Sequence, residues 1–275
     1  MSAFSHTQRD GRSVHVEDHG SGLPVFFQHG LGGDRNQVAD SFPAELACRR
    51  ITMECRGHGL TGLVAGEPVS IAGFADDLLT LADALGFEKF VVGGISMGAA
   101  IALRIAITHP ERVAGLILVR PAWISTPAPP SMAPFCVAAD HLRRLGADGR
   151  AAFLASPTGQ KLAAEAPDNL ASLSGFFDRS EPQAFADVLD AIASDGPGVD
   201  YADICALSVP TLVVGHDLDL VHPLAYARTL GDAIPNAHLA EITPKAVDKA
   251  RYSAELRAAI TAFIRHLDTS RENRP

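Results

Sequence analysis

The stretch GGISMG, at residues 93–98, joins two apolar segments of different length. The run at residues 89–93 has the length of a buried strand, and the segment at residues 97–108 has the length of a helix that ends before a proline. The glycines two positions either side of Ser96 remove side chains that would collide where strand and helix meet. The turn is therefore predicted to expose Ser96 at a helix N-terminus, where free N–H groups favour a developing negative charge. The alternative is that Ser96 only caps the helix, but a cap does not require flanking glycines.

The composition favours a large globular domain. The chain has 275 residues, 47% of them hydrophobic, which is enough for one core with an insertion. The net charge is −9 and Lys and Arg form no cluster, so neither a nucleic acid nor a membrane surface is an expected partner. Apolar stretches are shorter than the ~18 residues of a membrane span, and the N-terminus lacks the apolar core of a signal peptide. We expect a cytoplasmic protein with reduced cysteines and no metal, because the cysteines lack zinc-binding spacings.

Apolar runs alternate with segments of helical periodicity along most of the chain. We predict buried strands at residues 24–28, 50–55, 89–93, 113–119, 210–215 and 237–242. Between them, apolar residues spaced three and four apart, such as Ile71, Phe74 and Leu78, predict amphipathic helices. This alternation implies a parallel sheet covered on both faces, and the alternating segment at residues 12–19 predicts an antiparallel strand at its edge.

The alternation stops between residues 121 and 207. This part begins with the proline-rich PAWISTPAPPSMAP and then shows only helical patterns. We interpret it as a helical insertion, residues 121–207, joined at both ends to a core domain made of residues 1–120 and 208–275. Because open α/β sheets bind ligands outside the carboxyl ends of their strands, the insertion is expected above that edge of the sheet.

A second glycine-rich loop, QHGLGG at residues 28–33, follows the first buried strand. A flexible loop at a strand's carboxyl end can bring a backbone N–H close to a reacting carbonyl. We predict that the N–H groups of Leu31 and Met97 form an oxyanion hole, in which one donor typically contributes about 3 kcal/mol of transition-state stabilisation. The alternative is an ordinary glycine-rich turn.

Five segments make the chain resemble the α/β-hydrolase superfamily over nearly its whole length. They are QHGLGG (28–33), ECRGHGLTG (54–62), GGISMG (93–98), HPERVAGLILV (109–119) and VPTLVVGHDLDLVHP (209–223). The resemblance implies an α/β fold with a mostly parallel eight-stranded sheet, helices on both faces and an α-helical lid. It also implies a serine nucleophile at the elbow, an acid after a later strand, a histidine after the last strand, and no cofactor.

The resemblance assigns the nucleophile to Ser96 and the acid to the segment GHDLDLVHP, residues 215–223. Family members often carry a proline four residues after the acid, which favours Asp219, with Pro223 starting the next helix. Asp217 is the alternative acid. The physical task of the carboxylate is to orient an imidazole and to stabilise its cation.

The histidine of the family has no counterpart at the expected place. The loop after the last predicted strand, residues 243–252, contains no histidine, and Tyr252 stands roughly where the family places it. A tyrosine, with an unperturbed pKa of about 10, is a poor base near neutral pH. The candidate bases are His222, which is close to the acid in sequence, and His141, which lies in the insertion; His222 is the residue that we assign.

Arg120 and Trp123 follow a strand directly, at the root of the insertion. We predict that Arg120 clamps a substrate carboxylate, that Trp123 forms an apolar wall and that Tyr252 also contacts the substrate. The alternative for Arg120 is a salt bridge that holds the insertion to the core domain.

The expected function is hydrolysis of an ester, lactone or related carbonyl of a small molecule, which is the partner that we predict. The missing histidine leaves a second hypothesis open, namely a catalytically impaired binding protein on the same scaffold. A lyase is a third, because a fold does not determine a reaction.

Overall fold

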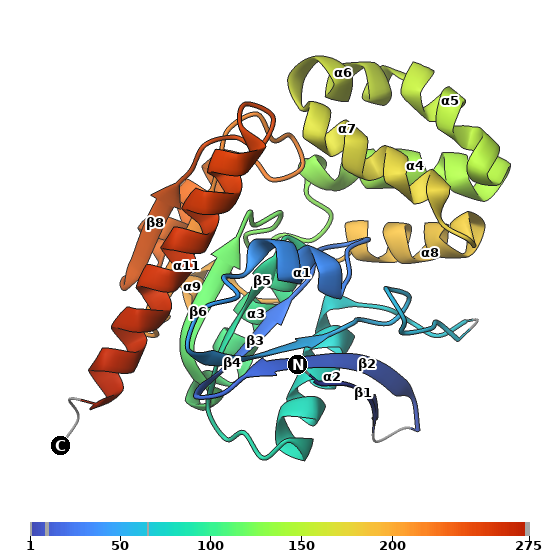
Figure 1. Ribbon diagram of the computed structural model, residues 1–275. Helices are drawn as coiled ribbons and strands as arrows, with labels where there is room; N and C mark the ends of the chain where they lie inside the picture. Colours follow the sequence, from blue (N-terminus) through green and yellow to red (C-terminus); the bar gives the residue numbers. More distant parts are fainter. Residues whose placement is uncertain (1, 9–10, 65, 273–275) are drawn as a thin grey trace.

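The computed structural model describes residues 2–8, 11–64 and 66–272 and contains one eight-stranded sheet (Figure 1). The strands are β1 (Ser2–Thr7), β2 (Ser13–Gly20), β3 (Leu23–Gln28), β4 (Cys48–Met53), β5 (Phe90–Ile95), β6 (Val113–Val119), β7 (Thr211–Gly215) and β8 (Ala237–Glu241). Their order across the sheet is β1-β2-β4-β3-β5-β6-β7-β8. β2 pairs antiparallel with β1 and β4, whereas the other pairs are parallel. The predicted mostly parallel sheet with an antiparallel edge is confirmed.

β1 is the strand that the sequence patterns did not predict. It lies at the edge of the sheet, and its residues alternate between exposed and half-buried positions. β1 pairs along most of β2, from Ser2 opposite Asp18 to Thr7 opposite Ser13. An edge strand of this kind needs no continuous apolar run, so it leaves little trace in the hydrophobic pattern.

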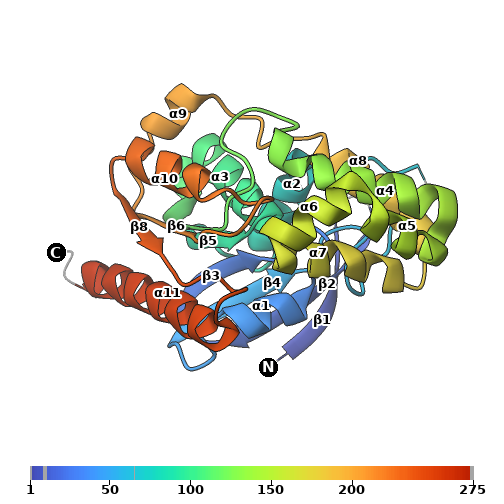
Figure 2. The ribbon, with the colours of Figure 1, turned by 90° about the horizontal axis from the view of Figure 1, so that it is seen from above.

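Helices cover both faces of the sheet, as predicted (Figure 2). One face carries α1 (Arg35–Ser41) and α11 (Lys249–Glu272), and the other carries α2 (Ile71–Ala84), α3 (Met97–Thr108) and α10 (Leu224–Ala233). All residues of the central strand β5 are buried, because helices pack on it from both sides. The predicted apolar stripe of α2 is buried as well, and Ser70 caps this helix by accepting a hydrogen bond from the N–H of Gly73.

A group of helices lies between β6 and β7, and we call them the β6–β7 helices. They are α4 (Ala133–Leu145), α5 (Gly149–Ala155), α6 (Pro157–Glu165), α7 (Pro167–Ser174) and α8 (Pro182–Ala193). All of residues 120–210 are described, and none of them is in a strand. The helices lie together above the carboxyl ends of the parallel strands (Figure 1), and the short α9 (Tyr201–Cys205) leads back to β7.

The β6–β7 helices share one hydrophobic core with the sheet. Leu142, Phe153 and Leu189 are fully buried and belong to the same cluster as the residues of α2 and α3. The ring of Phe176 contacts those of Phe135 and Phe185, with centroids 6.0 and 5.5 Å apart. The helices are therefore packed against the sheet domain, over the edge where the loops after β3, β5, β6 and β7 meet.

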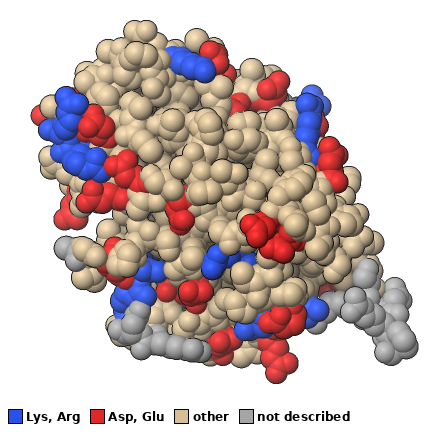
Figure 3. Space-filling model, turned by 180° about the vertical axis from the view of Figure 1, so that it is seen from behind, with Lys and Arg blue, Asp and Glu red and all other residues tan. Residues whose placement is uncertain are grey.

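Charged side chains of both signs are interspersed on the face of the molecule shown in Figure 3. Over the described ranges, no helix combines the length and the apolar character that crossing a membrane requires.

Candidate active site

Ser96 occupies the strained turn between β5 and α3. Its φ is 55° and its ψ is −110°, a conformation that residues with a Cβ rarely adopt and that typically costs about 1–3 kcal/mol. The N–H of Ser96 donates to the carbonyl oxygen of Val119 at 2.9 Å, which ties the turn to the end of β6. The Ser96 hydroxyl makes no capping hydrogen bond to the described N–H groups of α3. The alternative of a simple helix cap therefore does not describe this serine.

The glycines around Ser96 are required by close backbone contacts. A Cβ built on Gly98 would lie 2.5 Å from the carbonyl oxygen of Gln28, and one built on Gly94 would lie 2.6 Å from the same atom. The end of β3 thus passes against both glycines at once. This contact is the physical reason for the spacing that the sequence pattern displayed.

The loop after β3 lies beside the serine. A Cβ built on Gly30 would be 3.3 Å from the Cβ of Ser96, and the N–H of Gly30 donates to Oε1 of Gln37 at 2.7 Å. Leu31 follows in this loop and lines the same cavity as Ser96. Met97 is the first residue of α3, so its N–H has no acceptor within the helix. The loop and the helix start are therefore both close to Ser96, and the oxyanion hole of Leu31 and Met97 stays a prediction.

Asp219 and His222 form a pair on one turn after β7. The Nδ1 atom of His222 lies 2.9 and 3.0 Å from the two carboxylate oxygens of Asp219, and the N–H of His222 donates to Oδ1 at 3.0 Å. The Asp219 side chain is fully buried. Leu218 takes a left-handed φ of 57° just before it, which lets the turn fold back on itself. The alternative acid, Asp217, is exposed and accepts a hydrogen bond from the N–H of Leu218.

Arg120 neutralises the buried carboxylate. Its Nε donates to Oδ2 of Asp219 at 2.8 Å, and its Nη2 lies 3.1 Å from Nδ1 of His222. The backbone N–H of Arg120 donates to the carbonyl oxygen of Val214 at 2.7 Å, and this bond links the ends of β6 and β7. Arg120 thus makes an ion pair inside the site, with a partner in the loop after β7 rather than in the β6–β7 helices.

These contacts decide the protonation states at neutral pH. Burial on its own raises the pKa of Asp219, but the charge of Arg120 and the contact with His222 more than offset this and hold the pKa well below its ordinary value. Burial lowers the pKa of His222, and Arg120 lowers it further, against the opposing effect of Asp219. The pair is therefore a carboxylate and a neutral imidazole.

The hydrogen-bond network defines the tautomer of His222. Nδ1 faces both carboxylate oxygens of Asp219 at 2.9 and 3.0 Å, which can only accept, and Nη2 of Arg120 at 3.1 Å, which can only donate. We assign the proton to Nδ1, because the two shorter contacts are to the acceptor and Arg120 already donates to the carboxylate, and this assignment leaves the lone pair on Nε2. Nε2 is buried and has no hydrogen-bond partner within the described part of the chain. His222 lines the same cavity as Ser96, and a neutral imidazole is the form that can accept a proton.

A cavity of ≈ 220 Å³ brings together Ser96, Leu31, Arg120 and His222. Its walls come from the loops after β3, β5, β6 and β7 and from the β6–β7 helices, which contribute Phe135, Asn169, Ser172, Leu173 and Phe176. The cavity lies at the carboxyl edge of the sheet, where open α/β folds bind ligands.

The other predicted residues lie outside the lining of this cavity. Trp123 is buried, and its Nε1–H donates to the carbonyl oxygen of Asp195 at 2.9 Å. Tyr252 is buried edge-on against the ring of His216, with centroids 5.4 Å apart, and interacts with Arg120. His141 of α4 has its Nδ1 2.8 Å from the carbonyl oxygen of Val137, one turn earlier in the same helix.

Two residues of the cluster escaped the sequence patterns. His216 follows β7 directly, and its Nε2 lies 3.7 Å from Oδ2 of Asp219. Asn169 of α7 donates from Nδ2 to Oδ1 of Asp219 at 2.9 Å. The position of His216 at a strand end is a signal that a closer search of the sequence could have used. Asn169 carries no such signal, because its partner is 50 residues away.

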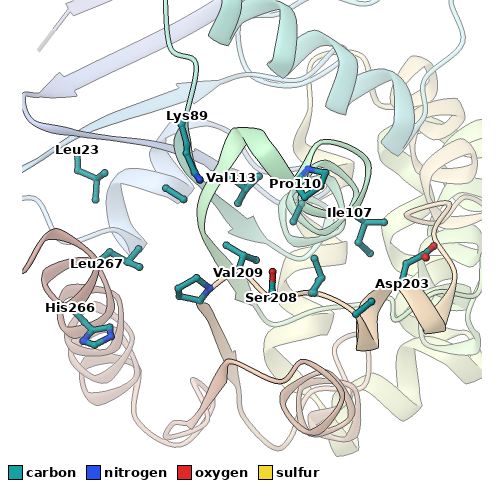
Figure 4. Close-up of a pocket in the computed structure, with 15 residues that line it drawn as sticks. Leu23, Lys89, Ile107, Pro110, Val113, Asp203, Ser208, Val209, His266 and Leu267 are labelled. Atoms are coloured by element: carbon teal, nitrogen blue, oxygen red, sulfur yellow. The ribbon is translucent and has the colours of Figure 1, made fainter. Parts of the chain in front are cut away.

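A larger hollow of ≈ 550 Å³ lies at the other end of the sheet (Figure 4). Its lining includes Lys89, Pro110, Asp203 and His266, and none of the predicted site residues. Leu23 and Val113, which begin β3 and β6, also line it, so this hollow is at the amino ends of the strands. The smaller cavity at Ser96 is the candidate active site because it combines a serine in a strained conformation with a buried carboxylate that contacts an imidazole.

Comparison with known proteins places the chain in a family. A family model described as the alpha/beta hydrolase fold matches residues 24–246. The protein of Rhizobium rhizogenes that carries the name carbamate hydrolase RutD is 31% identical over 242 residues, with 82% of this chain and 88% of that protein covered. The 2-hydroxymuconate semialdehyde hydrolase of Pseudomonas putida is 29% identical over 245 residues, with 83% and 82% covered. The chain belongs to the α/β-hydrolase fold family.

Solved structures agree with this assignment. A thermophilic esterase from Thermogutta terrifontis has a TM-score of 0.72 and 25% identity, with 97% of this chain and 99% of that chain covered. The enol-lactonase from Burkholderia xenovorans has a TM-score of 0.69 and 23% identity over 97% of this chain and 100% of its own, which shows a shared fold alone. These two relatives and two structures all carry the names of hydrolases.

The contact between Gly98 and β3 predicts a stability effect. Gly98→Ala should destabilise the protein by about 1–3 kcal/mol, because the new methyl group overlaps a backbone oxygen that cannot move alone. Gly175→Ala is the matched control, since nothing lies within 4 Å of a Cβ built there. Urea unfolding of both variants tests this. Equal midpoints for the two would contradict the tight turn.

Four buried imidazoles predict how stability depends on pH. Burial lowers the pKa of His29, His58, His216 and His222 in the folded state. As the pH falls below about 6.5, the unfolded chain takes up protons that the folded chain does not. Stability should therefore decrease, by up to about 1.4 kcal/mol per pH unit for each imidazole, until each folded pKa is reached. Thermal unfolding between pH 7.5 and pH 5 measures this, and a midpoint that is constant over the range would contradict it.

Proposed function

We propose that this protein hydrolyses a small uncharged ester, lactone or carbamate, with Ser96 as nucleophile and His222 as general base. The observation that carries the proposal is that the strained serine and an imidazole with an unpartnered Nε2 line one cavity of ≈ 220 Å³. Membership of a hydrolase family and the names of the relatives support it.

The chemistry proceeds in two halves. The Ser96 oxygen attacks the carbonyl carbon while its proton passes to Nε2 of His222, and the carbonyl electron pair moves to the oxygen. The N–H groups of Leu31 and Met97 stabilise this oxyanion, and Asp219 stabilises the imidazolium. The leaving group takes the proton from His222 as its bond to carbon breaks. Water then repeats the sequence on the acyl-enzyme and releases Ser96.

The base in this scheme comes from the same turn as the acid. His222 follows Asp219 by three residues, and both of its contacts to that carboxylate lie within 3.0 Å. Tyr252, which stands where the family places its histidine, packs against His216 and interacts with Arg120. His222 therefore supplies the imidazole from a different position in the chain than the family resemblance implies, and it still contacts a carboxylate.

The size and charge of the cavity suggest the substrate class. A volume of ≈ 220 Å³ is equivalent to about seven molecules of liquid water and is smaller than a typical pocket for drug-sized ligands. Arg120, the cationic residue among its described lining residues, is already paired with Asp219. A small neutral substrate therefore fits better than an anionic one, and Arg120 is assigned to the acid rather than to a substrate carboxylate.

We also propose that residues 121–207 act as a lid. Phe135, Leu173 and Phe176 of this segment line the same cavity as Ser96. Phe176 rests on the loop after β3, since a Cβ built on Gly32 would be 2.2 Å from its Cε1 atom. A substrate enters only if these apolar side chains move or leave a gap beside them.

Covalent labelling tests the nucleophile and the base together. A fluorophosphonate should label Ser96, and p-nitrophenyl acetate should be hydrolysed. His222→Gln should reduce both rates by about 10²–10⁴-fold, because general-base catalysis is lost. His141→Gln, a change outside the site, is the control and should keep both rates. The Ser96 adduct is located by mass spectrometry.

Three outcomes would contradict this proposal. Absence of labelling in folded protein, together with stabilisation by ester-like ligands, would favour a binding protein instead. Full activity of His222→Gln would assign the base elsewhere. Turnover that survives Ser96→Ala would indicate a non-serine reaction on this fold.

Phe176 should limit the acyl chain that the site accepts. Phe176→Leu is expected to raise the ratio of kcat/KM for p-nitrophenyl hexanoate over acetate by about tenfold, because it enlarges the apolar wall. Phe177→Leu is the matched control, since Phe177 is equally buried but packs on Phe153 and does not line the cavity. An unchanged ratio in Phe176→Leu would show that this ring is not part of the acyl site.

A further inference from the structure

Asn169 uses its whole side-chain amide on the turn that carries the acid and the base. Its Nδ2 donates to Oδ1 of Asp219 at 2.9 Å. Its Oδ1 accepts from the N–H of Leu220 at 2.9 Å and from the N–H of Val221 at 3.1 Å. Asn169 is 3% exposed, so water does not compete for these bonds.

These bonds connect two parts of the chain that are separate in sequence. Asn169 is in α7, one of the β6–β7 helices, whereas the turn belongs to the loop after β7. Ser172 and Leu173 of the same helix line the cavity. One short helix therefore covers the substrate cavity and holds the acid–base turn at the same time.

The bonds also fix which way the carboxylate of Asp219 faces. Oδ1 accepts from Asn169 and from the N–H of His222, while Oδ2 accepts from Arg120. With both oxygens held, the carboxylate plane is set, and Nδ1 of His222 lies against it at 2.9 Å. Loss of the Asn169 amide would remove one of the donors that hold Oδ1 and would leave the N–H groups of Leu220 and Val221 without their acceptor.

We propose that Asn169 is a positioning residue, which aligns the Asp219–His222 turn with Ser96 when α7 is seated over the cavity. The proposal rests on the function proposed above for His222. In this arrangement, the closing of the β6–β7 helices also aligns His222 with Ser96. The two changes occur together because Asn169 is part of α7 and its amide binds the turn that carries His222.

Two substitutions of Asn169 separate its roles. Asn169→Ala removes all three bonds, and it should lower kcat/KM and the rate of phosphonate labelling at Ser96 by between about tenfold and 100-fold, mainly through kcat. Asn169→Asp keeps an acceptor for Leu220 and Val221 but places a second carboxylate against Asp219. The added negative charge favours the imidazolium, so the acidic limb of the kcat/KM profile should move to higher pH.

Ser156→Ala is the matched control. Ser156 caps α6 by accepting from the N–H of Gly159 at 3.1 Å, and within the described residues its side chain makes no hydrogen bond to the acid–base turn. Its replacement loosens the β6–β7 helices without changing the turn. It should leave the pH profile and the labelling rate close to those of the unsubstituted protein.

Amide hydrogen exchange gives a readout that does not need turnover. In Asn169→Ala, the N–H groups of Leu220, Val221 and His222 should exchange faster, whereas in Ser156→Ala they should not. Unchanged protection of these three amides in folded Asn169→Ala overturns the proposal whether or not the protein is a hydrolase. If the amides of Asn169→Ala exchange faster but its labelling rate and kcat equal those of the unsubstituted protein, the proposal is also overturned. Asn169 would then stabilise the turn without aligning it for catalysis. Absence of labelling in the unsubstituted protein refutes the proposed function instead.

Discussion

The close approach of β3 to the turn around Ser96 is the constraint on which the site depends. The carbonyl oxygen of Gln28 would lie within 2.6 Å of a Cβ on either Gly94 or Gly98. The side chain of Gln28 accepts from the N–H of Met53, so β3 is held from the β4 side as well. Because these backbones cannot separate, the unfavourable φ of Ser96 is maintained, and its hydroxyl stays at the rim of the sheet instead of relaxing into a helix cap.

The electrostatics of the site follow from one buried carboxylate. An isolated Asp219 would be costly to bury, and Arg120 removes most of that cost by pairing with it. Burial lowers the pKa of His222 and the same cation lowers it further, so the imidazole is neutral and able to accept a proton but is a weaker base than one beside an unpaired carboxylate. Stability and basicity are therefore set by the same ion pair, and neither can be changed alone.

The sequence predicted those parts of the fold and site whose signals are local. The elbow is encoded within six residues and the strands within five to eight, and the elbow and every strand except β1 were located. The acid–base turn was harder, since it requires a left-handed φ at Leu218, where glycine would have been the recognisable signal. Trp123 was expected in the substrate site because it follows β6 closely, yet the chain turns it into the core. Asn169 depends on the packing of two distant segments, which no pattern in one sequence records.

In the function that we propose, acid and base lie on one turn, and this changes what must hold them. When the two residues come from the loops after two strands, as the family resemblance implies, each loop has its own anchor in the sheet. Here Asp219 and His222 share a single anchor at the end of β7, so an error in this turn displaces both. The second anchor has to come from outside the sheet. Arg120, which directly follows β6, and Asn169 of α7 bind the carboxylate from outside the segment after β7, one from the edge of the sheet and one from the helices above it. The placement of His222 on the same turn as Asp219 and the bond from α7 to that turn therefore belong together.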